Sequence, residues 1–420
     1  MLRNIQLVSL LCMLFTNSLL AQENFKVMFY NLLNFPNDTN VPNRIQHLDH
    51  ILSNYQPDLF MVCELNNAHG ANVILQVLQD RIDENYRSAV FTLNTSDDAT
   101  GNQNDLQNLM FFNSSKFILE SQYEITTLYR DFNHYKLKLN STNQSTNPVY
   151  LNVIVCHLKA SRGTDNQTLR LEMVQDLTTY LNSFPANSNV MLAGDLNVYT
   201  HLEPAFQELI STDNNIVFAD PANRMGSWHN NTNYIDVFTQ STRTQTGLGG
   251  ATGGFDDRFD FILTSTNMLS NQDIYYVDNS YQAFGNNGNI ACYNQEIKNA
   301  NCSGVDFSAE IREALYYFSD HLPVTLQLET NETLLNIPSY QTDSFQITGT
   351  NIIENILEIK INKTTLSTNK LYIFNTLGQV VKIISLETSK RLSIDVSNLS
   401  NGMYYIAMSN TNVQPLKFIK

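Results

Sequence analysis

Six apolar segments of this chain each end in, or enclose, a polar residue of a kind used in catalysis. They lie at Phe29-Tyr30-Asn31, Met61–Glu64, Ile154–His157, Val190–Asn197, Arg258–Leu263 and Ser319–Leu326. Short apolar runs bounded by polar residues predict buried β-strands, and rigid strand ends can aim several polar groups at one point. The sequence therefore predicts one polar site where these strands end.

The segments between these strands indicate the fold class. Apolar residues recur at helical spacing in Arg44–Tyr55, Val73–Ile82 and Leu169–Leu181, and further strands are expected at Gln107–Phe112 and Phe132–Leu139. Strands and helices mixed in this way predict a layered α/β domain. A content of 42% hydrophobic and 15% charged residues is typical of a globular chain.

Two of the six segments carry the most specific chemistry. Asp195 and Asn197 lie two residues apart after an apolar run, so their side chains share one face of a strand. Asp320 and His321 directly precede another apolar run. An acid, an amide and a histidine together suit the polarisation of water beside a metal-bound phosphate.

Polar residues that close all six segments point to function more strongly than one strand cap would. In the order NLLNF, CEL, CHLKAS, GDLN, RFDFIL and SDHLPV, the motifs between residues 31 and 324 resemble the endonuclease/exonuclease/phosphatase superfamily, which includes DNase I and the abasic-site endonucleases. The resemblance implies a four-layer α/β/β/α sandwich. It also implies divalent-metal-dependent hydrolysis of phosphodiester bonds.

The resemblance further implies a metal site. The residue that matches the family's metal-binding glutamate is Glu64; Asn31 supports the metal or its water, and Asp320 is a further acid near the metal. Oxygen ligands of this kind favour Mg²⁺ or Mn²⁺, with Ca²⁺ as an alternative structural ion.

Five residues receive catalytic roles from the same resemblance. Asp195 positions or deprotonates the attacking water, and Asn197 orients water and phosphate. His321 contacts the scissile phosphate, with Asp260 setting its tautomer. His157 matches the histidine that protonates the leaving oxygen in DNase I-like members.

The chain departs from the family pattern beside His157. DNase I-like members place a glutamate against this histidine, and here Asp105 is the candidate acid. Lys159, Arg162 and Arg258 lie close to the motifs and are candidates for contacts to the substrate phosphate, with solvated surface positions as the alternative.

Two further features have both a functional and a structural interpretation. The glycine-rich segment 247–254 is expected to form a mobile flap rather than a phosphate-binding loop, because no helix follows it. Trp228, the only tryptophan, is expected to be buried, with base stacking as the alternative.

The cysteines fit an oxidising compartment. Cys292 and Cys302 flank a polar loop and are expected to be able to form a disulfide. Cys63 and Cys156 precede site residues on their strands, so they point away from the site and are expected to pack as buried thiols.

The N-terminal residues predict export. Arg3 is followed by an apolar run that ends near Ala21, which is typical of a signal peptide over residues 1–21. The run is short for a membrane span, and no other apolar stretch reaches spanning length. The catalytic domain is expected over residues 22–330.

The C-terminal part has a different pattern. Residues 331–344 are expected to form a linker, and short alternating strands predict a small all-β sandwich over residues 345–420. The segments LYIFNTLGQVVK, IDVSNLSNGMYYI and KFIK resemble the C-terminal sorting domain of the type IX secretion system of Bacteroidetes. This resemblance implies that the secretion machinery is a partner; a carbohydrate-binding or adhesive module is the alternative.

The predicted function is a secreted or cell-surface, monomeric endonuclease that hydrolyses extracellular DNA. The net charge of −15 argues against a non-specific nucleic-acid coat protein. A phospholipase C or sphingomyelinase and a small-molecule phosphatase of the same superfamily are alternatives, and a non-catalytic surface module is an alternative of another class. The most aromatic loop, residues 275–284, is polar and Asn-rich, which does not favour membrane contact.

Overall fold

The computed structural model describes residues 23–36, 41–95, 106–270, 273–335, 345–348, 351–361, 370–385, 391–408 and 415–420. The predicted signal peptide and most of the predicted linker lie outside these ranges. Among the described residues, no helix has the length and apolar character needed to cross a membrane.

Residues 23–335 contain two β-sheets. The first has the order β11-β13-β1-β2-β4-β3, with β12 also paired to β13. Its strands are β1 (Glu23–Phe35), β2 (Leu59–Leu65), β3 (Tyr86–Ser88), β4 (Gln107–Asn113), β11 (Ile274–Tyr276), β12 (Gln282–Ala283) and β13 (Val324–Thr330). The second has the order β5-β6-β7-β8-β10-β9. Its strands are β5 (Phe117–Ile125), β6 (Phe132–Leu139), β7 (Tyr150–His157), β8 (Val190–Asp195), β9 (Phe218–Ala219) and β10 (Asp260–Ser265).

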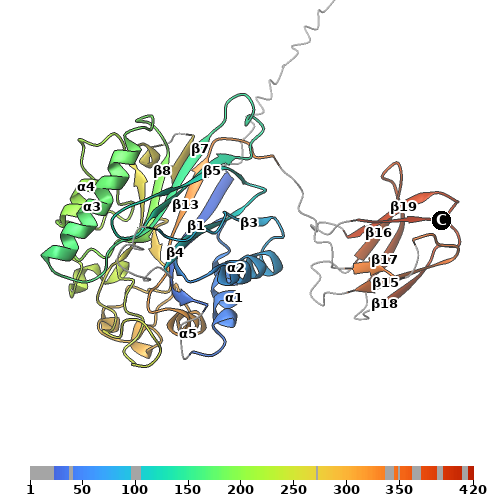
Figure 1. Ribbon diagram of the computed structural model, residues 1–420. Helices are drawn as coiled ribbons and strands as arrows, with labels where there is room; N and C mark the ends of the chain where they lie inside the picture. Colours follow the sequence, from blue (N-terminus) through green and yellow to red (C-terminus); the bar gives the residue numbers. More distant parts are fainter. Residues whose placement is uncertain are drawn as a thin grey trace, which may run out of the picture.

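Helices cover the outer faces of both sheets. They are α1 (Arg44–Tyr55), α2 (Ala68–Arg81), α3 (Thr164–Leu181), α4 (Pro204–Leu209) and α5 (Ala309–Phe318), with the short 3₁₀ helices η2 (Thr232–Val237), η3 (Thr266–Leu269), η4 (Ile290–Cys292) and η5 (Ala300–Cys302). Figure 1 shows α3 and α4 on the opposite side of the sheets from α1 and α2. The three helices predicted from apolar spacing are confirmed as α1 and as parts of α2 and α3.

The alternation of side chains along β7 shows how the layers are held together. Val153 and Val155 pack in the core between the two sheets, whereas Ile154 and Cys156 pack against α3. Both faces of this strand are therefore buried, which explains why its sequence is almost continuously apolar. The expected four-layer α/β/β/α arrangement is confirmed.

The C-terminal residues form a separate all-β unit. Its sheets have the orders β14-β15-β18 and β17-β16-β19-β20. The strands are β14 (Phe345–Ile347), β15 (Ile356–Ile361), β16 (Lys370–Asn375), β17 (Val380–Ser385), β18 (Arg391–Asp395), β19 (Met403–Met408) and β20 (Leu416–Ile419). Leu357, Leu371, Ile406 and Phe418 are fully buried between them, so the predicted small β-domain is confirmed.

Candidate active site

Strand pairing in the second sheet places three candidate residues in a row. In the parallel pair β7–β8, His157 is the partner of Asp195, and in the antiparallel pair β8–β10, Asp195 is the partner of Asp260. Side chains of directly paired residues point to the same face of a sheet. Asn31 of β1 reaches this row from the other sheet, because its amide contacts Asp195.

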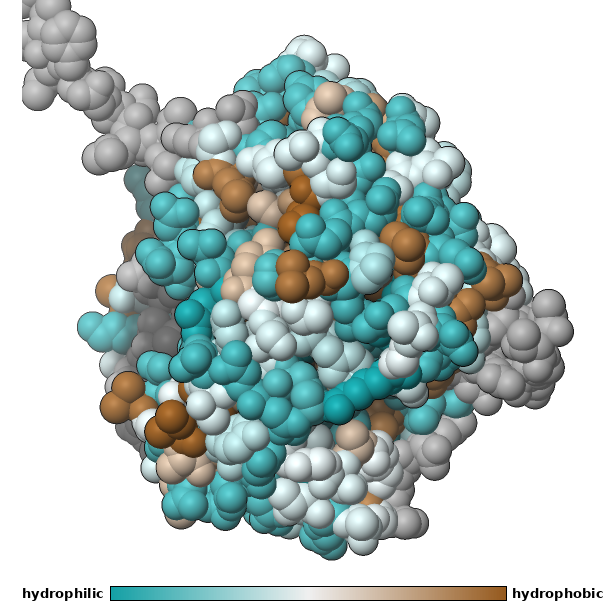
Figure 2. All heavy atoms as spheres, turned by 90° about the vertical axis from the view of Figure 1, so that its left-hand side faces the viewer, coloured by the Kyte–Doolittle hydropathy of each residue, from teal (hydrophilic) through white to brown (hydrophobic). Residues whose placement is uncertain are grey.

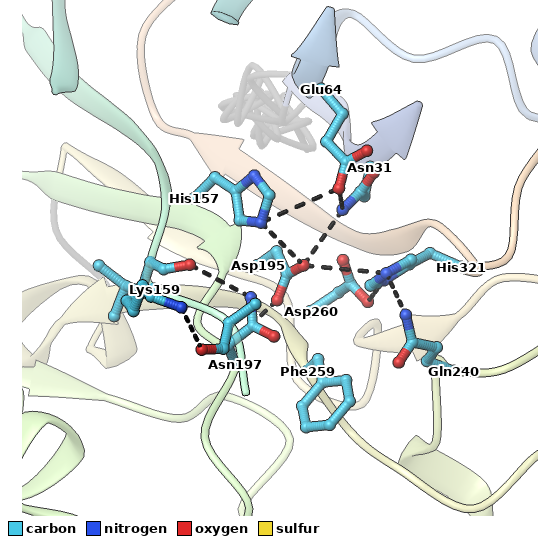
Figure 3. Close-up of polar contacts among 12 residues, drawn as sticks. Asn31, Glu64, His157, Lys159, Asp195, Asn197, Gln240, Phe259, Asp260 and His321 are labelled. Carbon is cyan, nitrogen blue, oxygen red and sulfur yellow. Dashed lines mark hydrogen bonds and ion pairs between the residues drawn. The ribbon is translucent and has the colours of Figure 1, made fainter. Parts of the chain in front are cut away.

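One carboxylate oxygen of Asp195 is the centre of the site. Its Oδ2 accepts a hydrogen bond from Asn31 Nδ2 (3.1 Å) and lies 3.6 Å from His157 Nε2 and 3.8 Å from His321 Nε2. The same Asn31 nitrogen donates to Glu64 Oε1 (3.0 Å). Figure 3 shows these side chains turned toward one another; four come from β1, β2, β7 and β8, and His321 comes from the residues just before β13.

The other oxygen of Asp195 is held by the chain that follows it. Asp195 Oδ1 accepts a hydrogen bond from the backbone N–H of Asn197 (3.1 Å), and Asn197 adopts a positive φ of 52°. The Asn197 side chain donates to the carbonyl of Leu158 (3.3 Å). The Asp-x-Asn segment therefore fixes the carboxylate and places the amide beside the end of β7.

His321 is oriented by a buried carboxylate. Its Nδ1 lies 2.7 Å from Asp260 Oδ2, and both side chains are at least 96% buried. Ser319 stabilises the local turn, since its hydroxyl donates to the carbonyl of Asn31 (2.8 Å) and accepts from the His321 N–H (3.1 Å). The predicted Asp–His pair is thus present.

Glu64 and Asp195, the two carboxylates that accept hydrogen bonds from Asn31, lie in surroundings that disfavour their negative charge. Burial and the charge of Asp320 raise the pKa of Glu64. Burial, with the charges of Asp260 and Glu64, raises the pKa of Asp195 to about 8, although the positive charge of His321 opposes this. Such a cluster favours an added cation.

The two histidines have opposite shifts. Burial lowers the pKa of His157 well below its ordinary value, and the nearby positive charges of Arg130 and His321 lower it further. Burial also acts to lower the pKa of His321, but the carboxylates of Asp260, Asp320 and Asp195 raise it well above its ordinary value. These shifts favour the neutral form of His157 and the cationic form of His321.

The donor set fits a hard divalent cation. Glu64, Asp195 and Asp320 carry carboxylate oxygens of the kind that such cations prefer, and ligand atoms of Asp195, Asp260 and His321 lie within 4.8 Å of one another. Asp320 Oδ1 is a buried oxygen with no hydrogen-bond partner among the described residues. Asn31 Oδ1 accepts the N–H of Leu33 (3.0 Å), and its nitrogen faces the carboxylates. Asn31 is therefore placed to orient the acidic ligands rather than to bind a cation directly.

Two of the three candidate phosphate contacts lie on the segment between β7 and α3, which we call the rim. Lys159 Nζ donates to the carbonyl of Ala160 (2.9 Å) and lies 5.2 Å from the ring centre of Tyr129. Arg162 is exposed and lies 4.8 Å from the ring centre of Tyr199. The Arg162 guanidinium also contacts His229 Nδ1 (2.8 Å). Contact of Lys159 and Arg162 with a phosphate stays a prediction.

The prediction that Arg258 contacts the substrate phosphate is wrong. Its side chain is fully buried and its guanidinium makes two 2.8 Å hydrogen bonds to Asp220. It also packs against Phe261 and Trp228. A charge buried in such a pair does not face substrate, so Arg258 stabilises the base of β10. Trp228 is fully buried, as expected.

The glycine-rich segment differs from the expected free flap. The N–H of Ala251 donates to Asp320 Oδ2 (2.7 Å), and Arg243 donates to the carbonyls of Leu248 and Gly249 (3.1 and 3.2 Å). The segment thus supports a site residue. Asp105, the candidate partner of His157, lies outside the described residues.

The structure adds two polar residues that sequence reasoning missed. Arg130 donates to the carbonyl of Leu158 (3.0 Å), next to His157. The amide nitrogen of Gln240 lies 2.5 Å from His321 Nε2 and donates to Asp320 Oδ2 (3.3 Å). Both residues lie in loops without a periodic pattern. The sequence could therefore have indicated them only through the chemical type of their side chains.

The cysteine predictions are confirmed. Cys292 and Cys302 form a disulfide. Cys63 and Cys156 are buried free thiols whose pKa values are raised by burial, which leaves them unreactive.

Known structures resemble this chain over about three quarters of its length. The human Nocturnin catalytic domain with bound sulfate is 14% identical, with a TM-score of 0.42, over 73% of this chain and 97% of that chain. Zebrafish (D. rerio) TDP2 complexed with single-strand DNA product is 13% identical, with a TM-score of 0.46, over 73% of this chain and all of that chain. An endonuclease/exonuclease/phosphatase family protein from Bacteroides thetaiotaomicron is 12% identical, with a TM-score of 0.43, over 74% and 98% of the two chains.

The C-terminal unit has a match of its own. Residues 351–420 match the secretion system C-terminal sorting domain, whereas no curated protein matches the chain. The chain thus has a two-sheet region and, over residues 351–420, a match to the secretion system C-terminal sorting domain.

Proposed function

We propose that this protein is a secreted, divalent-metal-dependent endonuclease that hydrolyses extracellular DNA. The observation that carries the proposal is the convergence on Asp195 Oδ2, within 4 Å of nitrogen atoms from Asn31, His157 and His321. A phosphate diester needs an oriented water and positive charge on its oxygens, and this arrangement offers both.

We propose a role for each residue around Asp195. Asp195 accepts a proton from the attacking water, and Asn197 holds that carboxylate while its amide orients the phosphate. His321, cationic through its pairing with Asp260, donates from Nε2 to a phosphoryl oxygen. Burying this charge in a low-dielectric site strengthens its interaction with the phosphate.

The metal would be held mainly by Glu64, with Asp320 beside it and Asn31 orienting the carboxylates. A bound Mg²⁺ or Mn²⁺ supplies positive charge to the phosphoryl oxygens and lowers the pKa of a bound water. His157 is neutral and has no hydrogen-bond partner at Nδ1 among the described residues. These features favour a role as hydrogen-bond donor to the phosphate over the acid role predicted from the sequence.

Export is the second half of the proposal. The match of residues 351–420 to a sorting domain supports delivery to the outside of the cell or to its surface. The catalytic domain is proposed to span residues 22–330, after a signal peptide over residues 1–21.

The lipid-cleaving alternative gains no support from the loop over residues 275–284 or from the face shown in Figure 2. In the predicted polar loop, Tyr275, Tyr276 and Phe284 are buried. Figure 2 shows that the face on the side of α3 and α4 is largely hydrophilic, with apolar residues in small separate patches. Membrane-binding faces gather apolar residues into one patch.

Cleavage of circular plasmid DNA by the mature protein, with Mg²⁺ or with EDTA, tests the proposal. We expect nicking that needs the metal and that falls by about 10³-fold or more in an Asp195→Ala, His321→Ala double variant. The exposed pair His69→Ala, Asp213→Ala is the matched control, because it removes the same residue types from the surface. Intact plasmid with folded wild-type protein, or equal nicking by the double variant, would contradict the proposal.

A further inference from the structure

The segment between β7 and α3 carries the two rim cations, and its backbone conformation is strained. Lys159 and Arg162 lie on it, directly after His157. Ser161 adopts a positive φ of 80°, and Gly163 follows with a φ of 103°. A side-chain-bearing residue in this region of φ is strained, so the conformation needs support from outside the segment.

Arg170 of α3 gives that support. Its side chain is fully buried, and Nη1 donates to the carbonyls of Lys159 (2.8 Å) and Ser161 (2.9 Å). The other side of the guanidinium makes two hydrogen bonds to Glu203 Oε2, from Nε (3.1 Å) and Nη2 (2.6 Å). Ser161, the strained residue, is thus held by the hydrogen bond that its carbonyl accepts from Arg170.

Glu203 connects the same pair to a second segment. Its Oε1 accepts the N–H of Tyr199 (2.8 Å), four residues after Asp195. The Tyr199 ring lies under the Arg162 guanidinium and packs edge-on against Phe259. The Arg170–Glu203 pair therefore joins the segments that follow β7 and β8.

The catalytic side chains do not depend on this pair in the same way. His157 and Asp195 are placed by the register of β7 and β8, and the N–H of Leu158 donates to the Asp195 carbonyl (2.9 Å). Loss of the pair would therefore move the rim while the centre of the site stays in place.

We infer that Arg170 and Glu203 are positioning residues that hold the rim for a polyanionic, multi-phosphate substrate. The inference rests on the proposed nuclease function and refines it. A polynucleotide reaches the rim cations through the phosphates that flank the scissile one, whereas a small diester occupies the centre alone. The pair therefore sets the preference for polymer over small diesters.

Kinetics of an Arg170→Lys variant with two substrates test this. Lysine keeps the charge but cannot bridge two carbonyls and a carboxylate at once. We expect KM for a single-stranded oligonucleotide to rise at least about tenfold, and kcat/KM for bis(p-nitrophenyl) phosphate to change by less than about threefold. A parallel fall for both substrates would overturn the inference.

Arg312→Lys is the matched control. Arg312 is also buried and holds two loop carbonyls, those of Ile297 and Asn299, at 2.8 Å each. These carbonyls belong to residues 297–299 and not to the segment between β7 and α3, so this variant is expected to lose stability without changing the ratio of the two activities. An equal change of that ratio in both variants would show that Arg170 only stabilises the fold.

A milder variant and a binding measurement keep the test decisive. If Arg170→Lys does not fold, Glu203→Gln gives the same comparison, because it keeps the side-chain volume and an oxygen acceptor for the Tyr199 N–H. Fluorescence anisotropy with the oligonucleotide should show weaker binding in either variant. A wild-type protein that cleaves neither substrate would instead refute the proposed function.

Discussion

The two-sheet region and the C-terminal β-domain differ in net charge and in whether they bury polar side chains. Residues 1–344 contain 17 Lys and Arg against 36 Asp and Glu, a net charge of −19, whereas residues 345–420 contain eight against four, a net charge of +4. Every buried polar or charged side chain among the described residues belongs to the two-sheet region. Burying such groups costs free energy unless they are paired, so a region that buries many of them has been shaped by more than packing.

This difference in polar burial indicates whether each region acts through its interior or through its surface. The two-sheet region holds its candidate chemistry inside, at the ends of buried strands, and matches acids to amides and histidines there. The described core of the C-terminal domain consists of apolar and aromatic side chains, such as Leu371 and Phe418. A domain with such a core can act only through its surface, which fits a sorting domain.

Removing residues 336–420 should separate the two functions completely. The truncated protein is expected to cleave plasmid DNA at the full-length rate once purified, because no site residue lies beyond His321. Export is expected to be lost in a host with the matching secretion pathway. Activity in cell and medium fractions measures both, and a truncated protein that is folded but inactive would contradict the separation.

Breaking one buried ion pair should have the largest effect on stability. Arg258→Leu leaves Asp220 charged and buried, which typically costs about 3–5 kcal/mol of unfolding free energy. The surface substitution Lys382→Leu in the C-terminal domain should change it by less than about 0.5 kcal/mol. Urea unfolding of the full chain compares them, and similar effects would mean that the two regions do not differ as described.

Much of the candidate site could be predicted from the sequence, and there is a physical reason why the other contacts could not. His157 and Asp195 each end an apolar run and Asp260 lies within one, and strand register brings the three together. The burial of Arg258 could not, because its partner Asp220 lies 38 residues earlier in a loop. A basic residue beside a motif looks the same in sequence whether it faces substrate or an acid.

The same limit applies to Gln240 and Arg170. Gln240 contacts His321 across 81 positions, and Arg170 acts on backbone carbonyls, which leave no trace in residue type. The periodic pattern of α3 identified a helix over residues 169–181 but gave no reason to separate Arg170 from a solvated arginine. Strand ends can be predicted from local pattern, whereas loop contacts depend on tertiary structure.

Acid should destabilise the two-sheet region through a residue outside the site. Burial lowers the pKa of His134 to about 4, from an ordinary value of 6.5. The stability from burying the neutral ring is present above pH 6.5 and is lost as pH falls toward 4, by about 3 kcal/mol in all. The C-terminal domain contains no histidine.

Unfolding measured between pH 7 and pH 4 for wild type, His134→Gln and the exposed control His69→Gln tests this. The His134→Gln variant should show a shallower loss of stability with acid than the other two proteins. The same slope in all three would assign the acid sensitivity to other groups.

Two glycine substitutions with a smaller effect than the His134 titration test how closely the glycine-rich segment approaches the site. A Cβ on Gly250 would lie 2.4 Å from the carboxyl carbon of Asp320, and its φ is +67°. Gly247 has a φ of +88° but nothing within 4 Å of its Cβ position. Both Gly→Ala variants should lose about 1–2 kcal/mol through the backbone, but only Gly250→Ala should displace Asp320 and reduce plasmid cleavage, by about tenfold. Equal cleavage by both variants would show that Asp320 tolerates the shift and does not contribute to the metal site.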